Sequence, residues 1–168
     1  MKKRFFCTLF LAAFFGPYVW AENVETNVWG NVINNIQIGI GTKDNNTQIK
    51  TNQSFNLGIR IKNLSTNESF YFYLPAAAIE GDPISFVVTS PSGKDVSPIP
   101  PRVELGSGAN VNVPPNQIYT YVFNLSYLCK FDEIGTYKVT AKMNVSATQH
   151  KSDWAISNPL YVTVVPDQ

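Results

Sequence analysis

The sequence predicts an all-β sandwich with Greek-key connections, and three observations support this prediction. Residues 132–145 alternate between apolar and polar side chains, which is the period of a strand with one buried and one exposed face. The apolar members are Tyr137, Val139, Ala141, Met143 and Val145. Clusters of turn residues separate about seven to nine short segments of this kind, and no segment has the apolar spacing of an amphipathic helix. Many short strands without helices indicate two antiparallel sheets packed face to face.

The first half of the chain predicts a leader followed by four strands. We expect residues 22–31 to form a loose leader that ends where Trp29 docks, and residues 32–168 to form one domain. The predicted strands cover residues 36–40, 54–63, 70–74 and 84–89. The third of these, F-Y-F-Y-L, is apolar on both faces, which is typical of a central strand.

The second half begins with a proline-rich segment and then returns to strands. Residues 97–115 hold five prolines, and proline lacks a ladder donor, so this segment predicts only short edge pieces at 103–105 and 111–113. Between those pieces we expect a flexible Gly106-Ser107-Gly108 loop. The later predicted strands cover residues 118–125, 135–145 and 160–165.

Residues 1–21 have the composition of a secretory signal peptide. Three basic residues precede an apolar run from Phe5 to Phe15, and the small residues Val19 and Ala21 stand before a cleavage point. The run is shorter than the ~20 residues that a membrane-spanning helix needs. We therefore expect cleavage after Ala21, no remaining membrane span, and a mature domain of 147 residues that is secreted or periplasmic.

Charge and cysteine content limit the possible partners and the stabilising bonds. Three of the 13 basic residues leave with the signal peptide, so the mature chain carries a net charge of −2. This balance argues against nucleic acid as a partner and against attachment to anionic lipid. Cys129 is the only cysteine after residue 21, so the domain is expected to be held by its apolar core without a disulfide.

The start of the Tyr137 strand resembles the tyrosine corner of immunoglobulin-like sandwiches. In that motif a Tyr hydrogen-bonds back to the chain just before its strand, and here Asp132-Glu133, Gly135 and Tyr137 carry the likeness. Over most of the chain, segments such as I-Q-I-G-I, N-L-G-I-R-I-K-N, G-T-Y-K-V-T-A and S-N-P-L-Y-V-T-V resemble a family of small secreted bacterial immunoglobulin-like proteins, mostly uncharacterised. The resemblance implies an immunoglobulin-like fold and no particular activity. Val139 stands where such domains place their second core cysteine.

No pattern of residues predicts catalysis, a metal site or a cofactor. Cys129 and His150 are the one possible pairing of a thiol with a base, and the strand between them would hold them roughly 35 Å apart. His150 is the only histidine, and the acidic segments 44–46 and 80–82 lack the alternating ligands of a calcium loop. We therefore expect a protein that is not an enzyme.

Two functions remain open. The first is a monomeric binding or structural module of the cell envelope that presents loops or an edge strand to a protein or glycan partner. The second is a protease inhibitor of the same fold, which would insert three loops into an active site. The candidate partner-binding residues are Asn63, Gly106, Ser107, Gly108, His150 and Trp154, and the structural ones are Gly135, Tyr137 and Val139.

Overall fold

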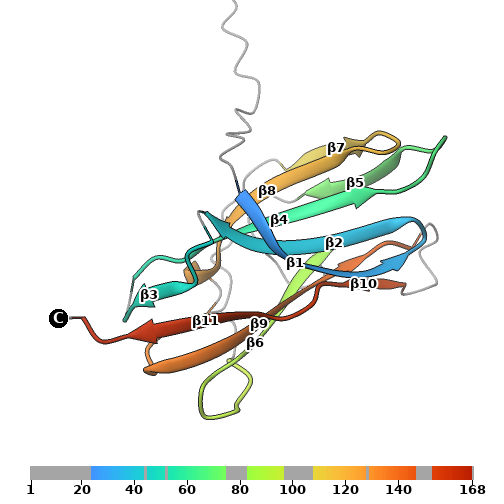
Figure 1. Cartoon of the computed structure of the whole chain (residues 1–168). Helices are drawn as coiled ribbons and strands as arrows, with labels where there is room; N and C mark the ends of the chain where they lie inside the picture. The colour runs from blue at the N-terminus through green and yellow to red at the C-terminus, as the bar shows by residue number, and fades with distance from the viewer. Residues whose placement is uncertain are drawn as a thin grey trace, which may run out of the picture.

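The computed structural model of the chain describes residues 24–43, 45–51, 53–74, 83–96, 108–127, 129–146 and 153–167 (Figure 1). These residues form eleven strands and one 3₁₀ turn, η1 (Leu125–Tyr127). The strands are β1 (Val24–Ile33), β2 (Ile36–Lys43), β3 (Gln48–Lys50), β4 (Asn56–Asn63), β5 (Phe70–Leu74), β6 (Ile84–Thr89), β7 (Ala109–Val113), β8 (Ile118–Asn124), β9 (Gly135–Asn144), β10 (Trp154–Ile156) and β11 (Leu160–Val165).

The strands build two sheets and a separate two-stranded ribbon. The first sheet has the order β1-β2-β4-β8. In the second sheet β6 pairs with one edge of β9, while β10 and β11 follow one another along its other edge, and β3 pairs in parallel with β11. The ribbon consists of β5 and β7. Figure 1 shows this ribbon at the end of the molecule opposite to β3.

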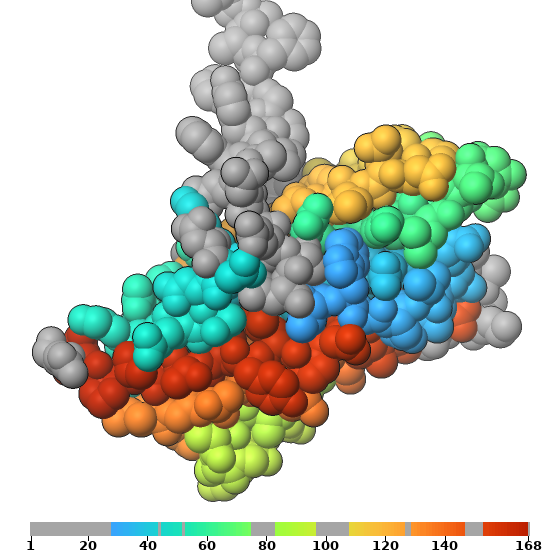
Figure 2. All heavy atoms as spheres, viewed as in Figure 1, coloured from blue at the N-terminus to red at the C-terminus, as the bar shows by residue number. Residues whose placement is uncertain are grey.

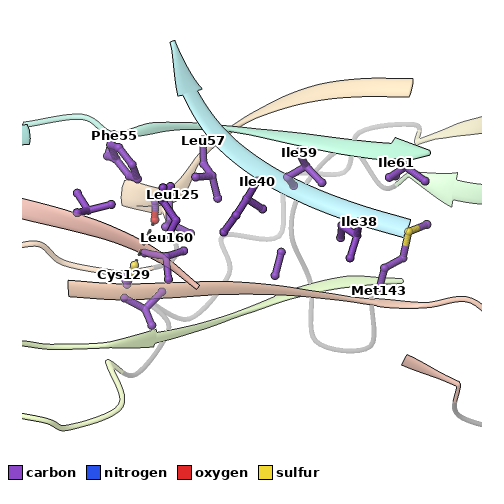
Figure 3. Close-up of a cluster of buried hydrophobic side chains, with 14 of the residues drawn as sticks. Ile38, Ile40, Phe55, Leu57, Ile59, Ile61, Leu125, Cys129, Met143 and Leu160 are labelled. Atoms are coloured by element: carbon purple, nitrogen blue, oxygen red, sulfur yellow. Dashed lines mark hydrogen bonds between the residues drawn. The ribbon is translucent and has the colours of Figure 1, made fainter. Parts of the chain in front are cut away.

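Alternating apolar residues of the two sheets fill the space between them. Residues 36, 38 and 40 of β2 and 57, 59 and 61 of β4 are buried, as are 137, 139, 141 and 143 of β9. Figure 3 shows Ile38, Ile40 and Met143 among the side chains that fill this space. Burying each large aliphatic side chain contributes about 1.5–3 kcal/mol, so this interface supplies most of the stability. The predicted all-β sandwich is confirmed.

The first strand corrects the expectation of a loose leader. Residues 24–33 form β1, which pairs with β2 through a turn whose central residues, Asn34 and Asn35, have φ of 50° and 63°. Two positive φ values are the requirement of the tight turn that matches strand twist, and asparagine tolerates them. β1 also reaches the second sheet, because the Asn31 side chain accepts a 3.0 Å hydrogen bond from the Ile156 backbone. In Figure 2, blue segments from the start of the described chain lie against red segments from near its end.

The corner before β9 has the geometry of the motif that it resembles. The Glu133 backbone N–H donates a 2.9 Å hydrogen bond to the hydroxyl of Tyr137, whose side chain is completely buried. Burial raises the pKa of this phenol. Gly135 has a φ of +131°, and a side chain there would lie 2.9 Å from Pro91, so only glycine suits the position. Val139 is buried in the centre of the sandwich.

The strand expected at residues 70–74 exists, but it is not a central strand. β5 pairs only with β7 among the described residues, and its side chains alternate between buried Phe72 and exposed Tyr71 and Tyr73. The expected piece at 111–113 belongs to β7, and the piece at 103–105 lies outside the described residues. The strands β3 and β10 have three residues each and were not predicted, because three residues are too few to show alternation.

Candidate functional site

The structure describes three of the six predicted partner-binding residues, and Gly106, Ser107 and His150 lie outside the described residues. Asn63 is only 1% exposed, so its side chain has no surface to offer a partner. Its amide nitrogen donates to the backbone oxygens of Glu68 (2.8 Å) and Val113 (2.9 Å), and its amide oxygen accepts from the Ser65 backbone (2.9 Å). Asn63 therefore ties the β5–β7 ribbon to the end of β4.

Gly108 lies at the far end of the ribbon from Asn63. The ribbon runs from the pair of Phe70 and Val113, beside Asn63, to the pair of Leu74 and Ala109, beside Gly108. The protease-inhibitor interpretation needs its loops together at one end, and the length of the ribbon, about 17 Å, separates these two. No observation therefore favours that interpretation.

Gly108 instead supports a tyrosine. Its backbone N–H donates a 3.0 Å hydrogen bond to the hydroxyl of Tyr73, and a side chain at this position would collide with the Tyr73 ring. Glycine thus lets the backbone approach closely enough to hold the ring in place.

The outward side of the ribbon is the candidate site, which we call the tyrosine face. It consists of Tyr71 and Tyr73 on β5 and of Asn110 and Asn112 on β7. Tyr71 is 68% exposed and Tyr73 is 51% exposed, and both asparagines are exposed. Tyr71 lies directly across from Asn112, and Tyr73 lies across from Asn110. The face therefore repeats one unit twice, an aromatic ring beside an amide.

The inward side of the ribbon fixes the tyrosine face to the sandwich. Phe72 and Val111 are buried, and the Phe72 ring meets the Tyr119 ring of β8 edge to face at 5.9 Å between centroids. The rings of Phe70 and Phe72 also stack at 5.7 Å. Edge-to-face and stacked pairs contribute about 0.5–1.5 kcal/mol beyond burial. The exposed tyrosines thus stand on a packed base.

A second exposed surface contains Trp154, the remaining predicted residue. Trp154 is the first residue of β10 and not part of a loop, and it is 36% exposed. The same outer side of the second sheet carries Lys138 opposite Tyr161 and Lys142 opposite Ile156. We call this surface the lysine–aromatic face, and its members are Lys138, Lys142, Trp154, Ile156 and Tyr161. Lysine stems commonly lie over apolar neighbours and shield them.

The described residues offer no activated nucleophile at Cys129. Its thiol is buried, lies 3.6 Å from the Leu125 carbonyl oxygen, and has its pKa raised to about 12 by burial. A thiol in this state is uncharged and inert near neutral pH. Across the described ranges, no three His, Cys, Asp or Glu side chains come together as metal ligands would. The same ranges contain no helix with the length and apolar character to cross a membrane.

Sequence reasoning missed the tyrosine face because all five residues of F-Y-F-Y-L are apolar or aromatic. The available signal was the alternation itself, in which Phe and Leu share one side and the two tyrosines share the other. Tyrosine carries a hydroxyl that needs a partner or water, whereas phenylalanine does not.

The fold and the tyrosine face together define a β-sandwich with an exposed aromatic ribbon. No protein-family model matches the chain, and no curated protein matches it in sequence.

Among solved structures, the C-terminal domain of wzt is similar in fold, with 10% identity and a TM-score of 0.49 over 86% of this chain and 80% of that domain. A β-glucosidase from Listeria innocua in complex with isofagomine matches 79% of this chain with 16% of its own length, at 16% identity and a TM-score of 0.41.

Proposed function

We propose that this protein is a non-catalytic binding module that works outside the cytoplasm, secreted or periplasmic, and holds a protein or glycan partner on its tyrosine face. The observation that carries the proposal is the pair of exposed tyrosines, Tyr71 and Tyr73, on a ribbon that is packed and hydrogen-bonded from beneath. Isolated exposed aromatic residues are ordinary, but a pair of tyrosines on one face of a packed strand is typical of recognition surfaces.

The physical support is that the free protein already orders the strand and one of its two exposed rings. Tyr73 is held by Gly108, and the strand beneath is held by Asn63 and Phe72. Tyrosine has few rotatable bonds and offers both a ring and a hydroxyl, so it gives a large contact for a small loss of entropy. A partner that meets such a surface loses less freedom than one that must order a loop.

The proposed location rests on residues 1–21, which have the order of a signal peptide. Expression of the full chain in a bacterial host is expected to give a periplasmic or secreted product that begins at Glu22. N-terminal sequencing of the product from each cell fraction checks this. A cytoplasmic product that begins at Met1 would contradict the location and leave the binding proposal standing.

The binding proposal is tested by capture from an envelope extract and on a glycan array, with one pair of variants. The double variant Tyr71→Ala/Tyr73→Ala is expected to lose the bound partner, because truncating aromatic anchors costs more than 1 kcal/mol each. The matched control is Tyr161→Ala, which removes an equally exposed tyrosine from the lysine–aromatic face. Capture that survives the double variant and is lost in the control would place the site on the other face and refute the proposal.

A further inference from the structure

We infer that the ligand of the tyrosine face is an uncharged glycan chain, an inference that rests on the proposed function and narrows it. The face offers two kinds of group: the solvent-exposed rings of Tyr71 and Tyr73 and the amides of Asn110 and Asn112. An aromatic ring carries negative charge on its face and attracts the C–H groups of a sugar ring. Each amide has two donor hydrogens and an accepting oxygen, which matches hydroxyls that both donate and accept.

The repeat of the face points to a ligand that also repeats. Directly opposite residues on paired strands have Cβ atoms about 4.5–5.5 Å apart, so each ring has its amide within reach of one small ligand unit. The two rings follow one another at about 6.8 Å along β5, since residues two apart share a side. A chain of similar sugar units can therefore place one unit on each ring and its hydroxyls on each amide.

The size of the face distinguishes a glycan from a protein partner. The ribbon has five residue pairs, so at ~3.4 Å per residue and ~4.8 Å between strands its outer side covers roughly 170 Å². This is a flat footprint, and a stable protein complex buries about 800 Å² of accessible surface on each partner. A protein partner would therefore have to contact surface well beyond the ribbon, whereas a few sugar units fit on the ribbon itself.

The charge of the face selects the class of glycan. Neither β5 nor β7 contains an Asp, Glu, Lys or Arg. The carboxylate of an acidic sugar would lose hydrating water on the ribbon and would find no cation there to pair with. Burying an unpaired carboxylate is costly. The lysine–aromatic face, with Lys138 and Lys142, provides the contrast within the same molecule.

The test is affinity electrophoresis of the mature chain in gels that contain neutral polysaccharides, namely an α-glucan, a β-glucan, a mannan and a galactan. Alginate serves as the acidic counterpart. At least one neutral polymer is expected to retard the protein, and either Tyr71→Ala or Tyr73→Ala is expected to weaken that retardation about tenfold. Asn110→Ala and Asn112→Ala are expected to weaken it less, by about threefold each. Tyr161→Ala is expected to bind as the parent does.

Conservative variants separate the stacking role from simple damage to the fold. Tyr71→Phe keeps the ring face and is expected to retain most of the binding that Tyr71→Ala loses. These positions are exposed, so thermal melts are expected to match the parent, except that Tyr73→Ala, which loses the hydrogen bond from Gly108, is expected to melt slightly lower.

Retardation by alginate alone, no retardation by any of the four neutral polymers, or retardation unchanged in the tyrosine variants would each overturn the inference. If an envelope protein is instead captured in a Tyr71- and Tyr73-dependent manner, the glycan assignment fails and the proposed binding function stands.

Discussion

The two larger sheets, which we call the body of the sandwich, and the β5–β7 ribbon share an alternating pattern of side chains but differ in what their outer sides carry. In the body, the outward positions of β9 are small or charged, Thr136, Lys138, Thr140 and Lys142, while the inward positions are fully buried. In the ribbon, the inward positions are also apolar, but the outward positions of β5 are tyrosines. The outer side of β9 therefore carries no aromatic residue, whereas the outer side of β5 presents two of them to solvent. In both regions the inner side of a strand secures the fold, while the residues of the outer side can vary with little effect on stability.

The first prediction concerns how well the body protects the buried thiol of Cys129 from a reagent in solution, and it has the largest expected effect. Near pH 8, Cys129 in the native chain from Glu22 onward is expected to react with Ellman's reagent about a thousandfold more slowly than an ordinary thiol. Its pKa is raised from 9.0 to about 12, which lowers the thiolate fraction, and burial slows access further. In guanidinium chloride the reaction is expected to be immediate.

The control for Cys129 brings the ribbon into the same measurement. A thiol introduced by Tyr71→Cys lies on the exposed ribbon and is expected to react at once, so the variant should show one fast and one slow equivalent. If both thiols reacted fast in native buffer, the surroundings of Cys129 would be as accessible to the reagent as the exposed ribbon, which would contradict the prediction.

The raised pKa of Cys129 also makes stability depend on pH. Because the folded pKa lies above the unfolded value, the stability that the neutral thiol contributes is full below pH 9 and declines as the pH rises toward 12.

The second prediction concerns the hydrogen bonds of Asn63, which connect the ribbon to the body. Asn63→Ala removes the hydrogen bonds to Glu68 and Val113, and the carbonyl of Val113, which is a buried residue, loses this donor. We expect the free energy of unfolding in urea to fall by about 2–4 kcal/mol. Hydrogen exchange is expected to accelerate more in β5 and β7 than in β9.

The matched control for Asn63→Ala is Asn56→Ala, an exposed position at the opposite end of the same strand, β4. This variant is expected to stay within about 0.5 kcal/mol of the parent. Equal exchange rates throughout the Asn63→Ala variant would show that the ribbon does not depend on this amide.

The third and smallest prediction concerns the corner of the body. Tyr137→Phe keeps the buried ring, 4.9 Å from the Phe131 ring, and loses only the hydroxyl that accepts from Glu133. We expect the free energy of unfolding in urea to fall by about 1 kcal/mol and glycan binding to stay unchanged. Tyr161→Phe, at an exposed hydroxyl, is expected to cost nothing measurable. If Tyr137→Phe also lost glycan binding, the prediction would be wrong, because the corner of the body would then influence the ribbon.

The body could be predicted from the sequence because its strands carry strict alternation. Leu57, Ile59 and Ile61 and the Tyr137 strand each have one unbroken apolar side, and the turn at the tyrosine corner has its own local signature. β1 was missed because its pairing with β2 includes bulges, which disturb the alternation.

The candidate site could not be predicted, because its features depend on contacts between distant residues. Asn63 looks like a polar turn residue until Val113, 50 positions away, brings its carbonyl to the amide. Phe70 to Leu74 cannot be told from a central strand until its single partner, β7, is known. The role of Gly108 likewise follows from the position of Tyr73, 35 residues earlier.

The parallel pairing of β3 with β11 has a consequence for how the chain acquires its structure during synthesis. The Thr51 backbone N–H and hydroxyl both donate to the Val165 carbonyl oxygen, which is 114 positions away. A nascent chain on the ribosome has β3 exposed long before β11 emerges, so the second sheet closes only late. Proteins dominated by such distant pairings fold in milliseconds to seconds. β3 therefore gains its parallel partner only after nearly the whole chain has been made.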